Sequence, residues 1–374
     1  MRPGVRYLQD ADGKSIAYTV HGQGPNLVLP AWWISHVERD WDHPSYRAFL
    51  EALGSHFRVV RYDRLGVGLS DREVRSQTMG SEVRLLADVV ETTIGNAQTS
   101  LFAFSCGCPV ALAYAAGHSN RVEKICIYGG YLDGADIAAP EIRTAMVGLV
   151  RAHWGAGSRA LADVFLPDQS REEIDAASRQ QRDSATAETA AALLELTYEM
   201  DATAVASSVT NDLLIIHRAG DRAIPPDAGR KLASVFSGVP IVVLDGRAHP
   251  PWVGDSDSIL TLAVEFLTGQ SYRSSRSTEN SDVSFLDVDT RTLVLSDGQI
   301  SLTALEFGAI HYFAQNSGRV VTRAELLEHV WKTPFAGSNK VDVLIRALRK
   351  KLGAESTRLE TVPGHGYLFR GDFL

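Results

Sequence analysis

Over residues 26–267, short apolar runs alternate with longer stretches of helical periodicity. Six runs of strand length are rich in Val, Ile, Leu and Phe, and they cover residues 26–32, 57–63, 100–105, 124–130, 212–221 and 240–246. Continuously apolar strands that alternate with helices are typical of a parallel sheet covered on both faces. The pattern therefore predicts an α/β fold for residues 1–267.

One long stretch between two of these runs carries no strand signal. Residues 131–208 are rich in Ala and Glu, as in ETAAALLELTYEMD, and indicate an insertion of helices. Such an insertion lies over the carboxyl ends of the strands, where open α/β sheets bind ligands. We expect a helical lid over about 131–208.

A Ser-rich stretch separates this piece from a smaller one. Residues 268–281, TGQSYRSSRSTENS, are almost free of aliphatic side chains, which is typical of a solvated linker. It leaves residues 282–374 as a second domain.

The second domain has a different order of predicted elements: a sheet, three helices and a hairpin. Residues 283–300 alternate in polarity and turn at Asp297-Gly298, which predicts a small antiparallel sheet. Capping boxes at 303–306 and 322–325 open two helices. The first carries Leu305, Ile310 and Phe313, and the second Leu326, Leu327, Val330 and Trp331. A third helix begins near Ser338 or Asn339, with an apolar stripe of Val341, Leu344, Ile345, Leu348 and Leu352. The tail, LETVPGHGYLFR, predicts a hairpin.

Composition and charge narrow the class of protein. The chain has 374 residues, 45% hydrophobic and 22% charged, which excludes a disordered or fibrous protein and suits two domains. A net charge of -8 argues against a nucleic-acid partner when taken as a whole. Residues 278–374, however, hold 11 Lys or Arg and 12 Asp or Glu, so -7 belongs to residues 1–277. The whole-chain charge therefore does not exclude DNA binding by the second domain.

The sequence also indicates where in the cell the protein is expected and whether it binds a metal or cofactor. The N-terminus lacks the apolar core of a signal peptide, and no run approaches the roughly 18 apolar residues of a membrane span. Three cysteines are too few for a disulfide scaffold. Cys106 and Cys108 could be two ligands of a metal site, but the sequence has no second Cys/His pair that would supply the other two. We expect a cytoplasmic protein with no membrane contact, no metal and no cofactor.

A serine motif stands at the end of one predicted strand. Residues 103–107, AFSCG, place Ser105 between small residues after an apolar run and before the helical stretch PVALAYAAG. This is the pattern of a nucleophile elbow, and the backbone N–H of Cys106 would face a developing oxyanion. An ordinary strand–helix turn is the alternative for so short a motif.

Two later residues complete a catalytic order. Asp221 ends one strand and His249 follows the next, in the order Ser, Asp, His. With RYDRLGVGLSDR at 61–72, these motifs resemble the α/β-hydrolase superfamily over most of residues 5–267. The resemblance implies Ser105 as nucleophile, His249 as general base and Asp221 as the acid that orients it. It also implies a second oxyanion donor at the N–H of Trp32, where Pro30-Ala31 replaces the usual His-Gly.

Other residues of the first domain leave alternatives open. Trp33, Trp154 and Trp252 suggest an aromatic ligand pocket under the insertion, or plain core. Cys106 and Cys108 are redox-sensitive thiols or, more in keeping with their small size, buried packing residues.

The second domain carries the longer resemblance. LTALEFGAIHYFAQNSGRVVTRAELLEHVW, NKVDVLIRALRKKLG and LETVPGHGYLFR closely resemble the winged-helix effector domain of OmpR/PhoB-type response regulators, an α+β fold, over 281–374. Its third helix has five basic residues and one acid between Ser338 and Lys351. The resemblance implies that this helix binds the DNA major groove and the hairpin contacts the adjacent minor groove. The expected DNA-binding residues are Asn339, Lys340, Val343, Arg346, Arg349, Lys350, Gly364, His365 and Tyr367.

Two functions follow from the combination. The first is a one-component, DNA-binding transcriptional regulator whose hydrolase-like domain senses, and can hydrolyse, a small molecule. The alternative is a serine hydrolase of an ester, lactone or similar acyl substrate with the winged helix as an accessory module. Expected partners are double-stranded DNA and a small-molecule ligand or acyl substrate, with RNA polymerase and a second copy of the chain as further candidates.

Overall fold

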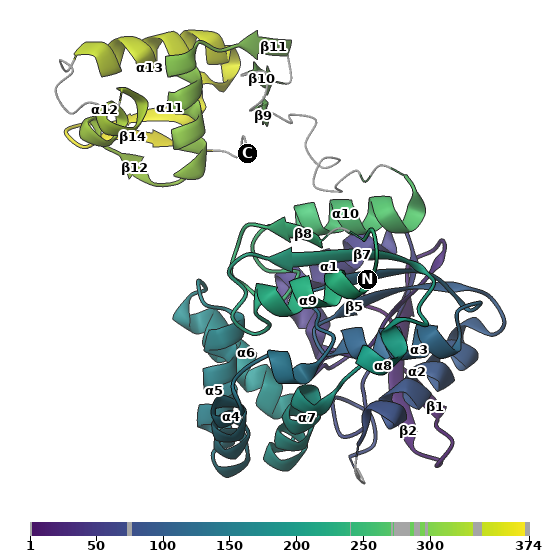
Figure 1. The fold of residues 1–374 in the computed structure, drawn as a ribbon. Coiled ribbons are helices and arrows are strands. Elements are labelled where there is room, and N and C mark those ends of the chain that lie inside the picture. Colours follow the sequence, from purple (N-terminus) through teal and green to yellow (C-terminus); the bar gives the residue numbers. More distant parts are fainter. Residues whose placement is uncertain are drawn as a thin grey trace. The chain divides into compact units, whose positions relative to one another are not determined.

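The computed structural model describes residues 2–72, 77–239, 241–270, 272, 285–287, 292–295, 298–331 and 339–370. The chain divides into two compact units, Met1–Ser274 and Ser275–Leu374 (Figure 1). Of the expected linker 268–281, residues 271 and 273–281 lie outside the described residues.

The first unit is built on an eight-stranded sheet of order β1-β2-β4-β3-β5-β6-β7-β8. Its strands are β1 (Arg6–Gln9), β2 (Ser15–His21), β3 (Asn26–Leu29), β4 (Arg58–Tyr62), β5 (Thr99–Phe104), β6 (Val122–Tyr128), β7 (Asp212–Arg218) and β8 (Ile241–Leu244). The six strands from β3 to β8 are parallel and coincide with the six predicted runs. The pair β1 and β2 adds an antiparallel edge that the apolar pattern did not predict.

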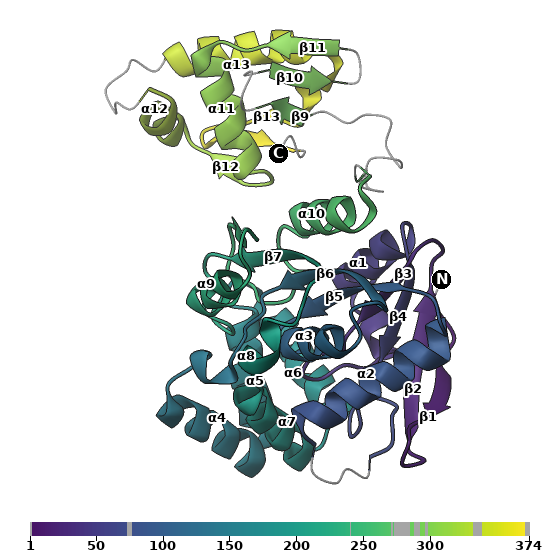
Figure 2. The ribbon, with the colours of Figure 1, turned by 45° about the vertical axis from the view of Figure 1, so that its right-hand side comes forward.

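Helices cover both faces of this sheet. On one face lie α1 (Pro44–Gly54) and α10 (Asp257–Thr268), and on the other α2 (Met79–Ile94), α3 (Gly107–Gly117) and α9 (Pro226–Val235) (Figure 2). Each face is a separate apolar core, and β5 between them is buried along its whole length. This burial explains why the parallel strands read as unbroken apolar runs.

A helical insertion joins β6 to β7, in the stretch where the sequence indicates a lid over about 131–208. Its helices are α4 (Pro140–Ala152), α5 (Trp154–Phe165), α6 (Arg171–Ser184), α7 (Ala187–Glu199) and α8 (Thr203–Ala206). The end of α6 is tied to the loop after β4, because Ser184 O accepts hydrogen bonds from Gly68 N and Arg72 Nη1 at 2.9 and 2.7 Å. Gln180 also donates to the buried carboxylate of Asp40 at 2.6 Å. The lid is thereby fixed to the sheet domain at one end.

The second unit follows the predicted order of sheet, three helices and hairpin. A first sheet holds β9 (Phe285–Asp287), β10 (Thr292–Leu295) and β11 (Gly298–Ser301), and a second holds β12 (Val320–Val321), β13 (Leu359–Val362) and β14 (Gly366–Phe369). The helices are α11 (Ala304–Gln315), α12 (Arg323–Trp331) and α13 (Asn339–Leu352). All five residues of the stripe predicted on α13 are buried in its core. Leu305 differs, since it is 42% exposed on the first turn of α11.

Both predicted capping boxes are present. Thr303 and Glu306 bond reciprocally at the start of α11. At α12, Thr322 N donates to Glu325 Oε2 at 2.7 Å and Glu325 N donates to Thr322 Oγ1 at 3.2 Å. The backbone bond from Thr322, helped by Arg319, lowers the pKa of Glu325 to about 2.

This cap makes the stability of the second unit depend on pH. A carboxylate whose folded pKa lies below its unfolded value stabilises the fold above the unfolded pKa and loses that effect as pH falls through the folded pKa. We expect Glu325→Gln to lower the melting temperature of the second unit by roughly 2–6 °C at pH 7, and by less and less as pH falls from about 4.5 towards 2. Differential scanning calorimetry measures this. Glu328→Gln, at an exposed position of the same helix, is the control; equal effects of the two variants at pH 7 would contradict the assignment.

Candidate active site and nucleic-acid interface

Ser105 occupies a strained turn between β5 and α3. Its φ of 51° makes it the one non-glycine residue with positive φ among the described residues. Its N–H donates to Tyr128 O of the neighbouring strand at 3.2 Å, and its carbonyl accepts from Cys108 N at 3.0 Å. A Cβ on Gly107 would stand 3.1 Å from Pro30 O, so the turn requires a small residue there. A serine held in the left-handed region at such a turn has the backbone of a nucleophile elbow.

Asp221 and His249 form a buried hydrogen-bonded pair. His249 Nδ1 lies 2.8 Å from Asp221 Oδ2, while Asp221 Oδ1 accepts from the backbone N–H groups of Ala223 and Ile224. Burial alone would raise the pKa of Asp221, but His249 and these hydrogen bonds lower it below its usual value. The carboxylate therefore stays ionised and holds the proton on Nδ1, which leaves Nε2 as the basic nitrogen of the ring.

The lid takes part in holding the histidine. His249 N donates to Phe165 O, at the end of α5, at 2.8 Å, and the two rings lie 5.6 Å apart. Ser105, Asp221 and His249 are all buried, with Ser105 8% exposed. The structure thus brings the three expected residues to the carboxyl ends of β5, β7 and β8 beneath the insertion.

Gly129, which sequence reasoning missed, makes room for this pair. It directly follows β6, its φ is 55°, and a Cβ built on it would stand 3.3 Å from His249 Cε1 and 3.4 Å from Asp221 Oδ2. A glycine at the end of a neighbouring parallel strand was the available signal, but a single sequence does not tell which other element the glycine faces.

Gly129→Ala is expected to displace the pair, because the new methyl group crowds the imidazole and alanine is disfavoured at positive φ. We expect the rate at which a fluorophosphonate labels Ser105 to fall by at least about tenfold, since a misplacement of about 1 Å can cost about 100-fold. Gly148→Ala is the matched control, because a Cβ there meets nothing within 4 Å. Equal labelling rates in the two variants would contradict this role for Gly129.

The expected oxyanion donors lie on either side of the elbow. Cys106 is the residue before the first turn of α3, and the Pro30–Trp32 segment follows β3 beside that turn, as the contact of Gly107 with Pro30 O requires. The structure thus brings the two expected residues to the same turn. Their assignment as donors rests on that placement and on the family resemblance.

The tryptophans divide between a cavity and the core. A cavity of about 70 Å³ is lined by Trp32 and Trp252 among others, and Trp252 stacks on Tyr46 with ring centroids 3.7 Å apart. Trp33 and Trp154 do not line this cavity. They pack edge to face on each other, and Trp154 donates its indole N–H to Ala185 O at 3.0 Å.

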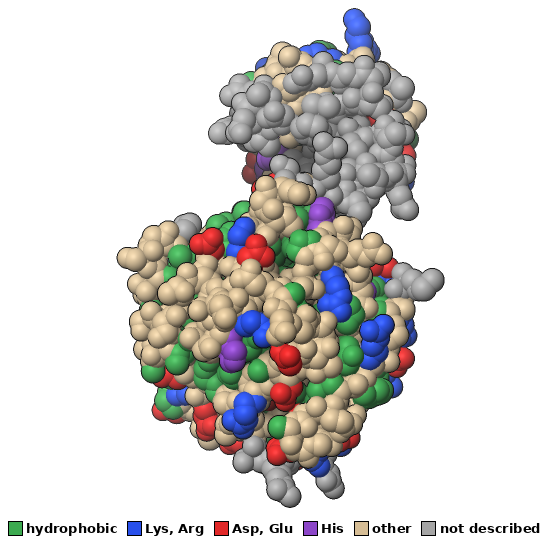
Figure 3. Space-filling view, turned by 90° about the vertical axis from the view of Figure 1, so that its right-hand side faces the viewer, with side chains coloured by type: hydrophobic (Ala, Val, Ile, Leu, Met, Phe, Trp, Pro, Cys, Tyr) green, Lys and Arg blue, Asp and Glu red, His purple; other side chains and the backbone are tan. Residues whose placement is uncertain are grey.

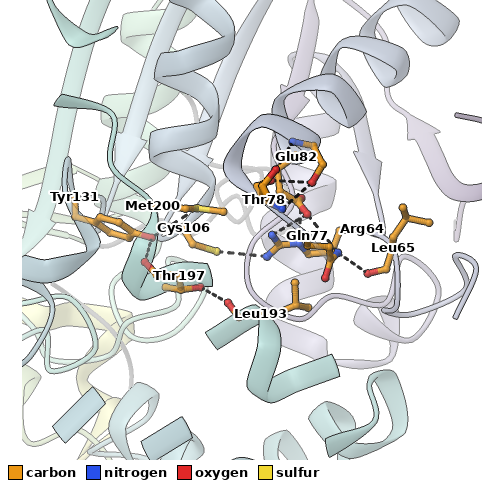
Figure 4. Close-up of polar contacts among 11 residues, drawn as sticks. Arg64, Leu65, Gln77, Thr78, Glu82, Cys106, Tyr131, Leu193, Thr197 and Met200 are labelled. Atoms are coloured by element: carbon orange, nitrogen blue, oxygen red, sulfur yellow. Dashed lines mark hydrogen bonds and ion pairs between the residues drawn. The ribbon is translucent and has the colours of Figure 1, made fainter. Parts of the chain in front are cut away.

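A buried ion pair that was not predicted lies behind the elbow. Arg64 and Glu82 are both buried and paired at 3.1 Å, and Arg64 Nη1 reaches Cys106 Sγ at 4.0 Å (Figure 4). Burial raises the pKa of the Cys106 thiol, and that of the buried thiols of Cys108 and Cys126 as well. Raised thiol pKa values and burial disfavour redox reactivity and favour the packing alternative for Cys106 and Cys108.

The second unit presents a short basic face on α13. Lys340, Val343, Arg346 and Lys350 are exposed at spacings of three and four residues, which places them on one side of the helix. Val343 is 65% exposed. At the hairpin, Gly364 and His365 are exposed. The side chain of Asn339 lies outside the described part of the structure.

Two expected DNA-binding residues are placed differently. Arg349 is turned back onto the hairpin, where its guanidinium donates to Leu359 O at 2.6 and 2.9 Å and to Thr361 Oγ1 at 2.9 Å. Tyr367 is 2% exposed and its hydroxyl bonds to Asp342. Both side chains therefore hold the hairpin against α13 rather than standing free at a DNA surface.

On the first unit, basic side chains are less concentrated than on α13. On the face of the first unit visible in Figure 3, Lys and Arg side chains are interspersed with Asp and Glu.

Within the described residues, no group of three or more His, Cys, Asp or Glu side chains is arranged to hold a metal ion. Across the same part of the chain, no helix combines the length and hydropathy needed to span a bilayer.

Comparison with known proteins identifies both units. The model of the α/β hydrolase family matches residues 19–259, so the chain belongs to that family. The model of the C-terminal domain of transcriptional regulatory proteins matches residues 297–369. The chain thus joins an α/β hydrolase domain to an OmpR/PhoB-type DNA-binding domain.

Individual relatives match one unit or the other. Pyrrolizixenacetamide deacetylase of Xenorhabdus hominickii is 24% identical over 263 residues, which cover 68% of this chain and 95% of that protein. The sensory transduction protein RegX3 of Mycobacterium tuberculosis (strain ATCC 25618 / H37Rv) is 36% identical over 90 residues, 23% of this chain. The chain spans only 40% of the length of RegX3.

Solved structures support the fold of the first unit. The enol-lactonase from Burkholderia xenovorans LB400 superposes with a TM-score of 0.59 at 24% identity, covering 70% of this chain and all of that one. A bromoperoxidase from Bacillus anthracis gives a TM-score of 0.62 at 19% identity, covering 71% and 99%. These likenesses establish the α/β-hydrolase fold.

Proposed function

We propose that the protein is a one-component transcriptional regulator in which a small molecule, bound at Ser105 under the lid, controls DNA binding by the winged helix. The proposal is supported by the presence, in one chain, of the buried residues Ser105, His249 and Asp221, the last two hydrogen-bonded, and of a winged helix with an exposed basic face. A single polypeptide then supplies both the sensor and the effector.

The winged helix would bind double-stranded DNA through α13. Lys340, Arg346 and Lys350 would contact phosphates and base edges in the major groove, with Gly364 and His365 at the adjacent minor groove. RNA polymerase and a second copy of the chain are further partners in this proposal, because an activator must contact the polymerase and half-sites are commonly bound in pairs.

A second candidate function is hydrolysis of an ester, lactone or amide. The Asp221–His249 hydrogen bond favours it, because a pure binding pocket has no need of an ionised carboxylate that orients an imidazole. Ser105 Oγ would attack the acyl carbon and give its proton to His249 Nε2, which passes it to the leaving group, and water would then release the acid. A sensor that slowly hydrolyses its own ligand would combine the two functions.

Covalent occupation of Ser105 tests the coupling without knowledge of the ligand. DNA fragments bound by the full chain are first selected from genomic DNA of the source organism. Affinity for a selected fragment is then measured before and after reaction with a fluorophosphonate, in wild type and in Ser105→Ala. A coupling of about 1–3 kcal/mol changes affinity about 5–150-fold in wild type alone. Unchanged affinity in the fully labelled protein, or the lack of any selected fragment, would overturn the proposal.

A further inference from the structure

The peptide group that joins Ala248 to His249 is held by hydrogen bonds at both of its polar atoms. Its carbonyl accepts a hydrogen bond from Arg218 Nη1 at 2.9 Å. Its N–H, which is that of His249, donates to Phe165 O of the lid at 2.8 Å. Because a peptide group is planar, bonds at both atoms fix the orientation of the plane and the position of the His249 Cα within it. The backbone that carries the imidazole is therefore held by Arg218 on one side and by the lid on the other.

Arg218 makes further contacts to the loop that carries His249. It is the last residue of β7, is 1% exposed, and donates from Nη2 to Asp255 O at 3.1 Å. Nη1 also lies 3.5 Å from Pro250 O, so the guanidinium contacts carbonyls on both sides of the histidine. A guanidinium presents its N–H donors in a rigid planar fork and can bond separate carbonyls at once, whereas an ammonium donates from a single point. One side chain thus ties together three positions of this loop.

Neighbouring residues accommodate the side chain of Arg218. Gly246 has a φ of 115°, and a Cβ built on it would stand 3.1 Å from Arg218 Cδ. The guanidinium carbon lies 5.8 Å from the centre of the Tyr128 ring, and Tyr128 Oη donates to Ala248 O at 3.4 Å. Tyr128 O in turn accepts from Ser105 N at 3.2 Å. The residue that supports the backbone of the elbow therefore also packs against the guanidinium.

Arg218 contacts the acid of the buried pair as well. Its backbone carbonyl accepts a hydrogen bond from Asp221 N at 3.3 Å. Asp221 Oδ2 lies 2.8 Å from His249 Nδ1. The main chain of Arg218 thus supports the carboxylate, while its side chain supports the loop that carries the imidazole.

We propose that Arg218 is the positioning residue for His249, because its guanidinium holds the peptide group before the histidine and thereby keeps the imidazole on Asp221. The inference rests on the proposed function, in which Ser105, His249 and Asp221 form the ligand site. Arg218 acts through the loop and not on the reacting atoms. Without its guanidinium, the carbonyl of Ala248 loses its shortest hydrogen bond and the loop can move away from the carboxylate.

Proton exchange at the imidazole tests this role without a ligand and without turnover. In full-length protein that contains ¹⁵N-labelled histidine, NMR measures how fast the Nδ1 proton that His249 donates to Asp221 exchanges with water. We expect Arg218→Met, which keeps the apolar stem and removes the donors, to raise this rate by about tenfold or more, because loss of a hydrogen bond from a charged donor eases local opening by about that factor. Arg218→Lys keeps the charge but not the fork, and it should give an intermediate rate.

The rate at which a fluorophosphonate labels Ser105 is a second measurement, because the reaction requires His249 to accept the serine proton. We expect this rate to fall by about tenfold or more in Arg218→Met, since a misplaced catalytic group costs at least about that much. Arg218→Lys should recover part of the loss.

Leu267→Ala is the control for a loss of stability alone. Leu267 is buried in α10, and the carbonyl of its neighbour Phe266 accepts a hydrogen bond from Lys124 near the start of β6. His249 lies at the opposite edge of the sheet, where the strands end. The control should lower the melting temperature and leave both rates within about twofold of the wild-type values, because distant sites act independently.

The outcomes separate a positioning role from a purely structural one. Rates in Arg218→Met that match those of Leu267→Ala would overturn the proposal, as would a wild-type protein without an observable Nδ1 proton. If Arg218→Met does not fold, Arg218→Lys decides, and rates equal to the wild-type rates would overturn the proposal. Neither measurement uses DNA, so failure of this inference is distinguishable from failure of the proposed regulator function.

Discussion

Ser105→Ala is expected to lower the hydrolysis of p-nitrophenyl acetate by at least about 10³-fold, because loss of the serine in a Ser-His-Asp site removes nearly all catalysis beyond binding and oxyanion stabilisation. Ser105 has the positive φ of 51° that is typical of a nucleophile elbow, and the residue is only 8% exposed. Steady-state kinetics on the full chain measures the effect, and mass spectrometry of the fluorophosphonate-treated protein locates the label.

The control for this experiment is Ser234→Ala, an exposed serine on α9 away from the site. It should hydrolyse and label as the wild type does. Turnover that survives in Ser105→Ala, or a wild-type protein that takes no label, would exclude hydrolysis at this site. The regulator hypothesis would then remain with a pocket that binds and does not react.

Much of the fold could be predicted because burial and capping leave local signals. Strands β3 to β7 are largely buried, so each shows an unbroken apolar run, whereas the edge strand β8 keeps an apolar run although Val243 is 43% exposed. The capping boxes at Thr303 and Thr322 could be found because their partners lie three residues away. By contrast, β1 and β2 form an antiparallel edge with a half-exposed pattern, and a four-residue strand such as RYLQ is too short for its periodicity to stand out.

The parts that could not be predicted depend on contacts between distant residues. Gly129 matters because His249 and Asp221, about a hundred residues later in the chain, approach it. The Arg64–Glu82 pair is of the same kind, since neither residue shows in the sequence that the other is buried beside it. Leu305 was named with Ile310 and Phe313 as an apolar residue of this helix, but it is 42% exposed in the structure.

The count of charges on α13 illustrates a further limit. A basic excess near +4 follows from the sequence, but the count treats every Lys and Arg as available. In the structure Lys351 donates to Ser301 O and to Glu306, and Arg349 donates to the hairpin. Helical periodicity indicates the direction of each Cα–Cβ bond, whereas a long side chain can still reach back to a carbonyl.

Arg346 and Arg349 should therefore behave in opposite ways when each is replaced by alanine. Arg346 is exposed on the same side of α13 as Lys340 and Lys350, so its loss removes a contact to DNA and leaves the fold intact. We expect Arg346→Ala to weaken binding to a selected fragment by about 1–3 kcal/mol, or about 5–150-fold. If it contacts a phosphate, the slope of log affinity against log salt should also fall by about one. The melting temperature should not change.

Arg349→Ala should act first on stability, because it leaves the carbonyl of Leu359 and the hydroxyl of Thr361 without their donor. Loss of hydrogen bonds from a charged donor costs about 1.5–3 kcal/mol, and for a domain of this size each 1 kcal/mol lowers the melting temperature by about 4–8 °C. Calorimetry and fluorescence anisotropy on the two full-length variants separate the effects. An Arg349→Ala protein that melts as the wild type does but no longer binds DNA would contradict this assignment. Arg349 would then contact DNA, and its hydrogen bonds to the hairpin would not be essential for stability.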